Sequence, residues 1–179
     1  MKNYVIPAAT VAALTLAAGS FVFASGDESR HAKATLVGFQ ENPSISTTGR
    51  GTLDLRIDEA TQTIEYELSY EGLEGVGTTP FVTDGVVIAS HIHVGARGVN
   101  GGVSVFLCGG GDKPACPTPS GTVTGVIDAA DITGPATQGI NAGEPTAFDE
   151  LLRAIRAGYA YVNVHTTRWP SGEIRGQIK

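Results

Sequence analysis

Hydrophobic and polar residues alternate one by one along much of this chain, which is the period of a β-strand. The clearest case is residues 51–58, where Leu53, Leu55 and Ile57 share one face and polar side chains take the other. Residues 63–70 alternate in the same way, and a short link of four residues joins the two segments. We therefore expect a hairpin in an antiparallel sheet that has one buried face and one face in water.

Further strands are expected wherever short runs rich in β-branched residues stand between turn signals. These segments are residues 34–39, 86–94, 103–107, 121–127, 159–166 and 173–179. The intervening stretches are rich in Gly, Pro and small polar residues, and they include expected loops at residues 72–85 and 132–145.

One segment has the period of a helix instead. Residues 146–157 place four apolar side chains on one helical face: Phe148, Leu151, Leu152 and Ile155. Thr146 is the candidate N-cap, and Gly158 is a natural stop. The whole pattern predicts an all-β fold, an antiparallel Greek-key β-sandwich or barrel with one short helix.

The N-terminal residues follow neither period. Lys2 precedes an almost wholly apolar or small stretch, residues 4–24, and this predicts a secretory signal peptide that is cleaved before Ser25. An uncleaved N-terminal membrane anchor is the alternative, because the stretch is close to the roughly 20 residues that a spanning helix needs. The expected organisation is a signal segment 1–24, a short segment 25–31 and one domain 32–179. The expected location is secreted, periplasmic or at the cell surface, with membrane contact only through an uncleaved segment.

Charge narrows the range of partners. Without Lys2 the chain has 11 basic and 18 acidic residues, a net charge of −7. An acidic domain without a basic stripe is not expected to bind nucleic acid. Metal ions and other cations are electrostatically more plausible partners, although the charge also serves solubility.

The two cysteines, Cys108 and Cys116, enclose the seven residues GGGDKPA. In an exported chain the favoured interpretation is a disulfide that closes this Gly-rich loop. Thiolate ligation of a metal and two free thiols are the alternatives.

The histidines are the candidate ligands of a metal ion. His91 and His93 lie two residues apart in an expected strand, so both point to the same face, roughly 6.5–7 Å apart along it. His165 ends another expected strand. If the two strands are neighbours, three imidazoles converge, and imidazole suits copper, zinc, iron and nickel. In an exported protein an all-imidazole site favours copper or zinc, and ligand softness alone does not choose between them.

Three further residues are candidates for roles at the same site. His31 precedes the first core strand and could be a fourth ligand, or it could have no ligand role. Arg168 and Arg175 follow His165 and could attract a small anion to a metal. The alternative for Arg175 is an ion pair, for example with Glu173 or Glu41.

Four blocks of the sequence together resemble the CHRD domain, first described as a repeat in chordin. They are the opening strand and Q-E-x-P turn at 34–43, the H-I-H-x-G block at 91–103, the helix at 151–158, and the closing segments 160–166 and 172–178. The resemblance covers nearly all of the expected mature chain. It implies an all-β, immunoglobulin-like or superoxide-dismutase-like sandwich.

A weaker resemblance concerns the order of the site residues. The His-x-His pair, a later strand that ends in Val-His, and a following Arg are similar to the copper half of copper–zinc superoxide dismutases. This implies copper ligation by His91, His93 and His165, with Arg175 or Arg168 as the anion-steering arginine. The bridging histidine and the zinc-ligand cluster of that family have no counterpart here, so the resemblance implies a copper-only site.

The sequence and these resemblances thus predict an exported copper-binding protein, with zinc as the second choice of metal, that dismutes superoxide or that stores or delivers copper. The alternative is a metal-free cell-surface module, structural or protein-binding, in which the histidines would hydrogen-bond to the backbone or to Asn163.

Overall fold

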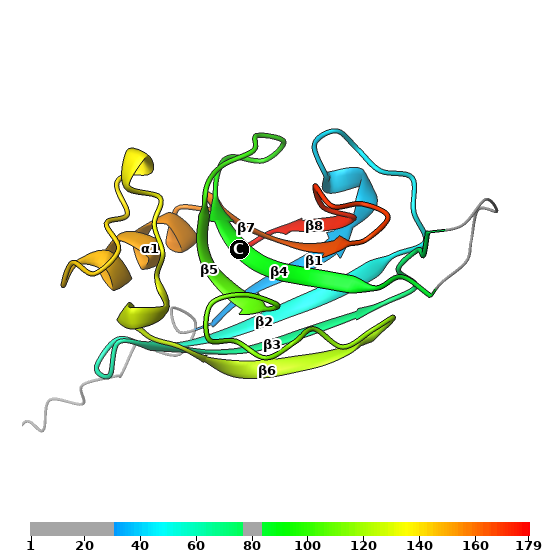
Figure 1. Ribbon diagram of the computed structural model, residues 1–179. Coiled ribbons are helices and arrows are strands. Elements are labelled where there is room, and N and C mark those ends of the chain that lie inside the picture. Colours follow the sequence, from blue (N-terminus) through cyan, green and yellow to red (C-terminus); the bar gives the residue numbers. More distant parts are fainter. Residues whose placement is uncertain (1–30, 77–83) are drawn as a thin grey trace, which may run out of the picture.

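The computed structural model describes residues 31–76 and 84–179, and one eight-stranded antiparallel sheet dominates them (Figure 1). The expected signal segment 1–24 and part of the expected loop 72–85 lie outside the described residues. The strands are β1 (His31–Val37), β2 (Arg50–Asp58), β3 (Thr63–Glu71), β4 (Val87–Val94), β5 (Val103–Cys108), β6 (Gly121–Ile127), β7 (Ala160–Thr166) and β8 (Ile174–Gln177).

The strand order in the sheet is β5-β4-β7-β8-β1-β2-β3-β6. The sheet curls so far that it forms a nearly closed barrel, with β5 and β6 at its two ends. Between these ends, the Tyr66 hydroxyl on β3 donates a hydrogen bond of 2.8 Å to the Leu107 carbonyl on β5. The predicted antiparallel sandwich or barrel with one short helix is confirmed.

Alternation produced these strands. In β2 and β3 every second side chain is buried, and the hairpin between them pairs Leu53 with Leu68 and Ile57 with Ile64. The first strand begins at His31, earlier than the expected residue 34, because Ala32 and Ala34 continue the buried face and pair with β2.

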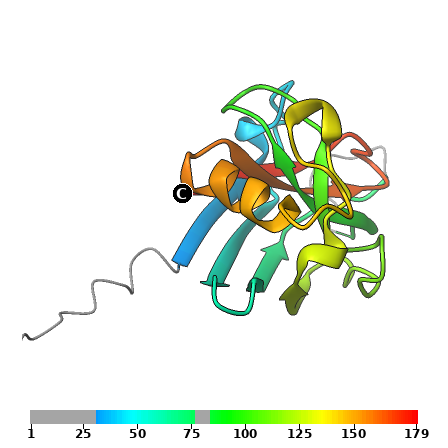
Figure 2. The ribbon, with the colours of Figure 1, turned by 90° about the vertical axis from the view of Figure 1, so that its left-hand side faces the viewer.

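Helix α1 (Ala147–Arg156) lies across one end of the barrel, which faces the viewer in Figure 2. Its predicted apolar face is buried in the core: Phe148, Leu151, Leu152 and Ile155. Thr146 occupies the N-cap position but does not cap with its side chain, whose hydroxyl donates instead to Glu150. Gly158, at φ +73°, follows the helix as expected.

Three short 3-10 turns complete the described elements: η2 (Gly38–Gln40), η3 (Ala129–Asp131) and η4 (Ala136–Gln138). The last two occupy the connection from β6 to α1. Of these, η4 lies within the predicted polar linker 132–145, from which Ile132 and Ile140 also enter the core. No helix among residues 31–76 and 84–179 is long and apolar enough to cross a membrane.

The disulfide between Cys108 and Cys116 is formed, with its Cα atoms 5.0 Å apart. It closes the loop after β5, which packs back on its own strand because Gly110 lies directly against the Phe106 ring. The favoured interpretation of the two cysteines is confirmed. They are therefore not thiolate ligands.

Candidate metal centre

The pairing of β4 with β7 brings the candidate ligands together. In this register Ala89 is opposite His165, His91 opposite Asn163 and His93 opposite Tyr161. Side chains alternate between the two faces of a strand, so Ile92, Val162 and Val164 enter the core and their neighbours point outward. The polar side chains of β4 and β7 therefore share one face. We call this outward face of β5, β4, β7 and β8 the covered face.

The three imidazoles form one compact cluster. The nitrogen atoms that His91, His93 and His165 offer to an ion all lie within 4.8 Å of one another. His91 Nδ1 and His93 Nε2 are 2.7 Å apart, and the ring centroids of His91 and His165 are separated by 4.4 Å. Each side chain is only 8% exposed. The predicted convergence of the histidines is thus present.

Backbone carbonyls fix the orientation of two of these rings. His93 Nδ1 lies 3.0 Å from the Gly101 carbonyl oxygen, and His165 Nδ1 lies 2.9 Å from the Pro170 carbonyl oxygen. A carbonyl only accepts, so each Nδ1 must carry the hydrogen and donate it. In a neutral ring the lone pair is then on Nε2, which points into the cluster. This arrangement of outer hydrogen bonds is typical of metal-ligating histidines.

Burial keeps the rings in the form that ligates. Desolvation, followed by the proximity of His165 and His93, lowers the pKa of His91 to about 3. Desolvation also lowers the pKa of His93 and of His165, against the opposing effect of their carbonyl partners. All three rings are therefore neutral near pH 7, and neutral imidazole is the ligating species.

Aromatic rings enclose the cluster on two sides. Tyr161 stacks on His93 with an interplanar angle of 3°, and the Tyr161 hydroxyl accepts a hydrogen bond from the Gly101 amide. Phe106 on β5 meets His91 edge to face at 5.1 Å between centroids. These contacts limit how far the imidazoles of His91 and His93 can turn. A site built on strands and held in this way is preorganised.

Arg175 lies beside the cluster and is only 1% exposed. Its guanidinium carbon is 3.4 Å from the centre of the Tyr161 ring. It donates hydrogen bonds to the carbonyls of Ala96 and Val99 and to the Asn100 side chain. These contacts hold the 95–102 segment over the covered face, where it lies above β4 (Figure 1). The donors of Arg175 are thus directed at the loop.

The other two predicted site residues lie elsewhere. Arg168 pairs with Glu74, at 3.4 Å, donates to the Gly75 carbonyl and stacks over Trp169. His31 begins β1 opposite Arg56, is exposed, and is not part of the histidine cluster. The structure therefore brings together three of the four predicted ligands and does not bring His31 to them.

Two further residues belong to this neighbourhood. Asn163 is 3% exposed, and its Oδ1 lies 2.9 Å from His165 Nε2 and 3.1 Å from His93 Nε2. Burial raises the pKa of Glu41 to about 7, although Arg175 opposes this. Sequence reasoning named Asn163 only as a partner in a metal-free site and Glu41 only as a partner of Arg175. The alternation of residues 161–165 in the sequence does place Asn163 on the face of His165, but nothing local indicates that the loop carrying Glu41 folds over it.

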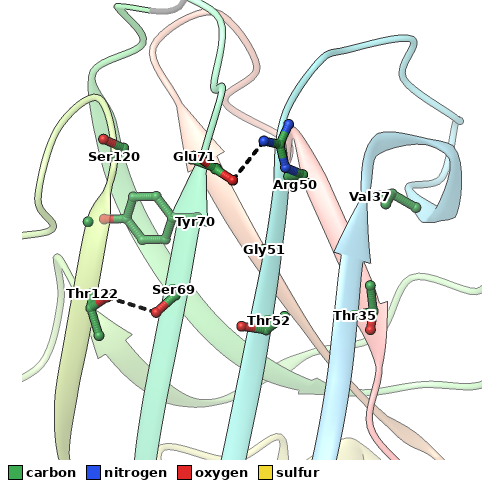
Figure 3. Close-up of a pocket in the computed structure, with 11 residues that line it drawn as sticks. Thr35, Val37, Arg50, Gly51, Thr52, Ser69, Tyr70, Glu71, Ser120 and Thr122 are labelled. Carbon is green, nitrogen blue, oxygen red and sulfur yellow. Dashed lines mark hydrogen bonds and ion pairs between the residues drawn. The ribbon is translucent and has the colours of Figure 1, made fainter.

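A second concave surface lies on the outward side of β1, β2, β3 and β6, which we call the open face (Figure 3). This shallow pocket of about 540 Å³ contains a row of hydroxyl side chains in register across the four strands: Thr35, Thr52, Ser69 and Thr122. Its charged groups pair with each other, since Arg50 and Glu71 lie 2.8 Å apart. Ser69 and Thr122 also share a hydrogen bond. Four of the polar side chains in the pocket therefore already have partners within it.

The family model of the CHRD domain matches residues 32–178. The match covers far more than half of the chain, so this protein belongs to the CHRD domain family. Neither a curated protein nor a solved structure was found that matches the chain.

Proposed function

We propose that this CHRD protein is exported and binds a single copper ion through His91, His93 and His165. The observation that carries the proposal is the convergence of three neutral imidazoles, two of which have their lone pairs turned inward by the carbonyls of Gly101 and Pro170. The Nε2 lone pairs of His93 and His165 both point into the cluster, where a cation would satisfy them together. The disulfide between Cys108 and Cys116 suits an oxidising compartment outside the cytoplasm.

The donor set supports copper over zinc. An imidazole site of fixed geometry binds Cu²⁺ more tightly than Zn²⁺, following the general order of divalent metal affinities. Both cysteines are taken by the disulfide, so no thiolate from them competes for a softer metal. Zinc remains the second choice, and it is the natural competitor in any test.

Storage or delivery of copper is the role that the arginines favour. Steering of superoxide by Arg175 or Arg168 would need a guanidinium with free donors near the metal. Arg175 donates instead to the loop over the site, and Arg168 pairs with Glu74. Dismutation of superoxide is the second candidate, because the order of the three histidines and the following arginine is similar to that in the copper half of copper–zinc superoxide dismutases.

The test is metal stoichiometry in the full chain, expressed so that it is exported. We expect one copper per chain after dialysis against equal copper and zinc, and none in the His91→Ala/His93→Ala variant. A wild-type protein that retains no metal would reject the proposal and support a metal-free surface module. Superoxide turnover by the copper-loaded protein above that of free copper would assign the enzyme role.

A further inference from the structure

Asn163 occupies the centre of the covered face. On β7 it stands between Tyr161 and His165, and its strand neighbours are His91 on β4 and Arg175 on β8. A buried amide is costly unless its polar atoms are satisfied. The Oδ1 atom of Asn163 therefore needs a hydrogen-bond donor or a cation next to it.

This oxygen faces two nitrogens that cannot donate to it. The Nδ1 hydrogens of His93 and His165 are directed to the Gly101 and Pro170 carbonyls, so the Nε2 atoms of the neutral rings carry lone pairs. An amide oxygen is also only an acceptor. Oδ1 of Asn163 and these two Nε2 atoms thus form a set of acceptors with no hydrogen between them. A cation at their centre would satisfy all three.

The distances between these atoms fit a common ion. Ligands bound at about 2.0 Å are about 2.8 Å apart at a right angle and about 3.3 Å apart in a tetrahedron. The separations are 2.7 Å from His91 Nδ1 to His93 Nε2, 3.1 Å from His93 Nε2 to Asn163 Oδ1, and 2.9 Å from Asn163 Oδ1 to His165 Nε2. Asn163 Oδ1 therefore has the spacing of a fourth ligand.

Glu41 stands on the other side of this amide. It is 7% exposed, and its Oε1 is buried without a hydrogen-bond partner among the described residues. A Cβ atom at Gly172 would collide with Glu41 Oε1 and lie 2.9 Å from Asn163 Nδ2. The glycine thus leaves a gap that these two polar atoms share. A carboxyl oxygen near Nδ2 favours the amide orientation that turns Oδ1 toward the imidazoles.

We propose that Asn163 supplies the oxygen ligand of the metal site through Oδ1, and that Glu41 is the positioning residue that fixes its amide. The inference rests on the proposed function, because it extends the three-histidine site to a four-ligand one. An amide oxygen is a hard, neutral ligand, which suits a divalent ion better than a soft monovalent one.

The experiment compares Asn163→Leu and Asn163→Asp in the full, exported chain, using Cu²⁺ itself as the probe. The Leu side chain has similar volume and no donor atom, whereas Asp keeps the oxygen. We expect Asn163→Leu to bind one Cu²⁺ with a Kd raised on the order of 10-fold or more. We also expect its copper hyperfine splitting in electron paramagnetic resonance to change. Asn163→Asp should bind at least as tightly as the wild type, with a spectrum shifted by the added charge.

Asn141→Leu is the matched control, because Asn141 is exposed and lies near α1, away from the cluster. It should leave both the affinity and the spectrum unchanged. For Glu41, the Leu variant should shift the copper spectrum toward that of Asn163→Leu. Glu41→Gln, which keeps an oxygen beside the Asn163 amide, should have the copper spectrum of the wild type.

The outcomes separate the two proposals. A wild-type chain that binds no copper would refute the histidine site itself. A wild-type chain that binds copper, with Asn163→Leu showing the same Kd and the same spectrum, would overturn the role of Asn163 and leave the histidine site intact. If Asn163→Leu does not fold, Asn163→Asp decides, because an unshifted copper spectrum would show that this position is not a ligand.

Discussion

The covered face and the open face are outward surfaces of the same barrel, and both carry polar side chains on alternating strand positions. On the open face these side chains pair in water, as Lys33 does with Asp54 at 2.5 Å, with both side chains at least half exposed. On the covered face the loops lie over the strands, and the histidines are 8% exposed. The contrast shows that alternation selects an outward position, whereas the loops above it decide whether that position becomes a site.

The largest expected difference lies between two histidines on these two faces. His165→Ala should weaken copper binding by more than about 100-fold, because even changes in the outer shell of a metal site cost 10–100-fold. His31→Ala should have no effect, since His31 is exposed on the open face. Competition titration with a copper chelator measures both. Equal losses in the two variants would contradict the assignment of the ligands.

Two arginines, one on each face, should contribute by different amounts to the free energy of unfolding. Arg175→Met removes the donors to Ala96, Val99 and Asn100 from a buried position, and we expect a loss of about 2–4 kcal/mol in the free energy of unfolding. Arg50→Met removes an exposed pair with Glu71 and should cost no more than about 1 kcal/mol. Urea unfolding of the metal-free protein gives both values. Equal costs would show that the loop does not depend on Arg175.

The stability of the metal-free protein should depend on pH because of the buried histidines on the covered face. The lowered pKa of His91, about 3, means that only the unfolded chain takes up a proton there as the pH falls below about 6.5. Stability should therefore fall between about pH 6.5 and 3, by up to about 1.4 kcal/mol per pH unit for each such ring. His91→Asn should flatten this slope in urea unfolding at several pH values.

Glu41 provides a check of opposite sign. Its pKa is raised from 4.5 to about 7, so the folded protein holds a proton that the unfolded chain has lost in this range. Its contribution to stability is complete below about pH 4.5 and is lost as the pH rises to about 7. Glu41→Gln should therefore make the fall in stability toward acid steeper. An unchanged slope in both variants would contradict the burial of these groups.

The smallest effect is expected from an isolated pair on the open face. Lys33→Gln breaks an exposed ion pair with Asp54 and should change the free energy of unfolding by less than about 1 kcal/mol. The effect should shrink further in high salt. A change as large as that of Arg175→Met would mean that the open face contributes to stability in a way that its exposure does not indicate.

The local sequence pattern was sufficient to predict the strands, the helix and part of the candidate site. The alternation of Leu53, Leu55 and Ile57 predicted β2, and the spacing of Phe148 and Ile155 predicted α1. The shared face of His91 and His93 also follows from the period of a strand. These features need only neighbours in sequence.

The remaining features depend on contacts between distant segments. Whether His165 meets His91 is decided by the pairing of β4 with β7, two strands that lie about 70 residues apart in the sequence. The contacts of Arg175 with Val99, and the place of Glu41 beside Asn163, depend on loops whose course no periodicity reports. Whether His31 is a ligand could not be predicted for the same reason. The alternation shows which face of its strand His31 occupies, but it does not show the order of the strands in the barrel.

The carbonyls of Gly101 and Pro170 have a consequence for the exchange of metal. Because they hold the hydrogens of His93 and His165 on the outer ring nitrogens, and burial keeps both rings neutral, the proposed ion would enter or leave without either imidazole giving up or regaining a hydrogen. The heat of binding should then be nearly independent of the buffer's ionisation enthalpy, in contrast to a cysteine site, where capture of the ion expels protons. Since burial lowers the pKa of all three rings, an ion bound as proposed would be collected in mildly acidic surroundings about as readily as in neutral ones.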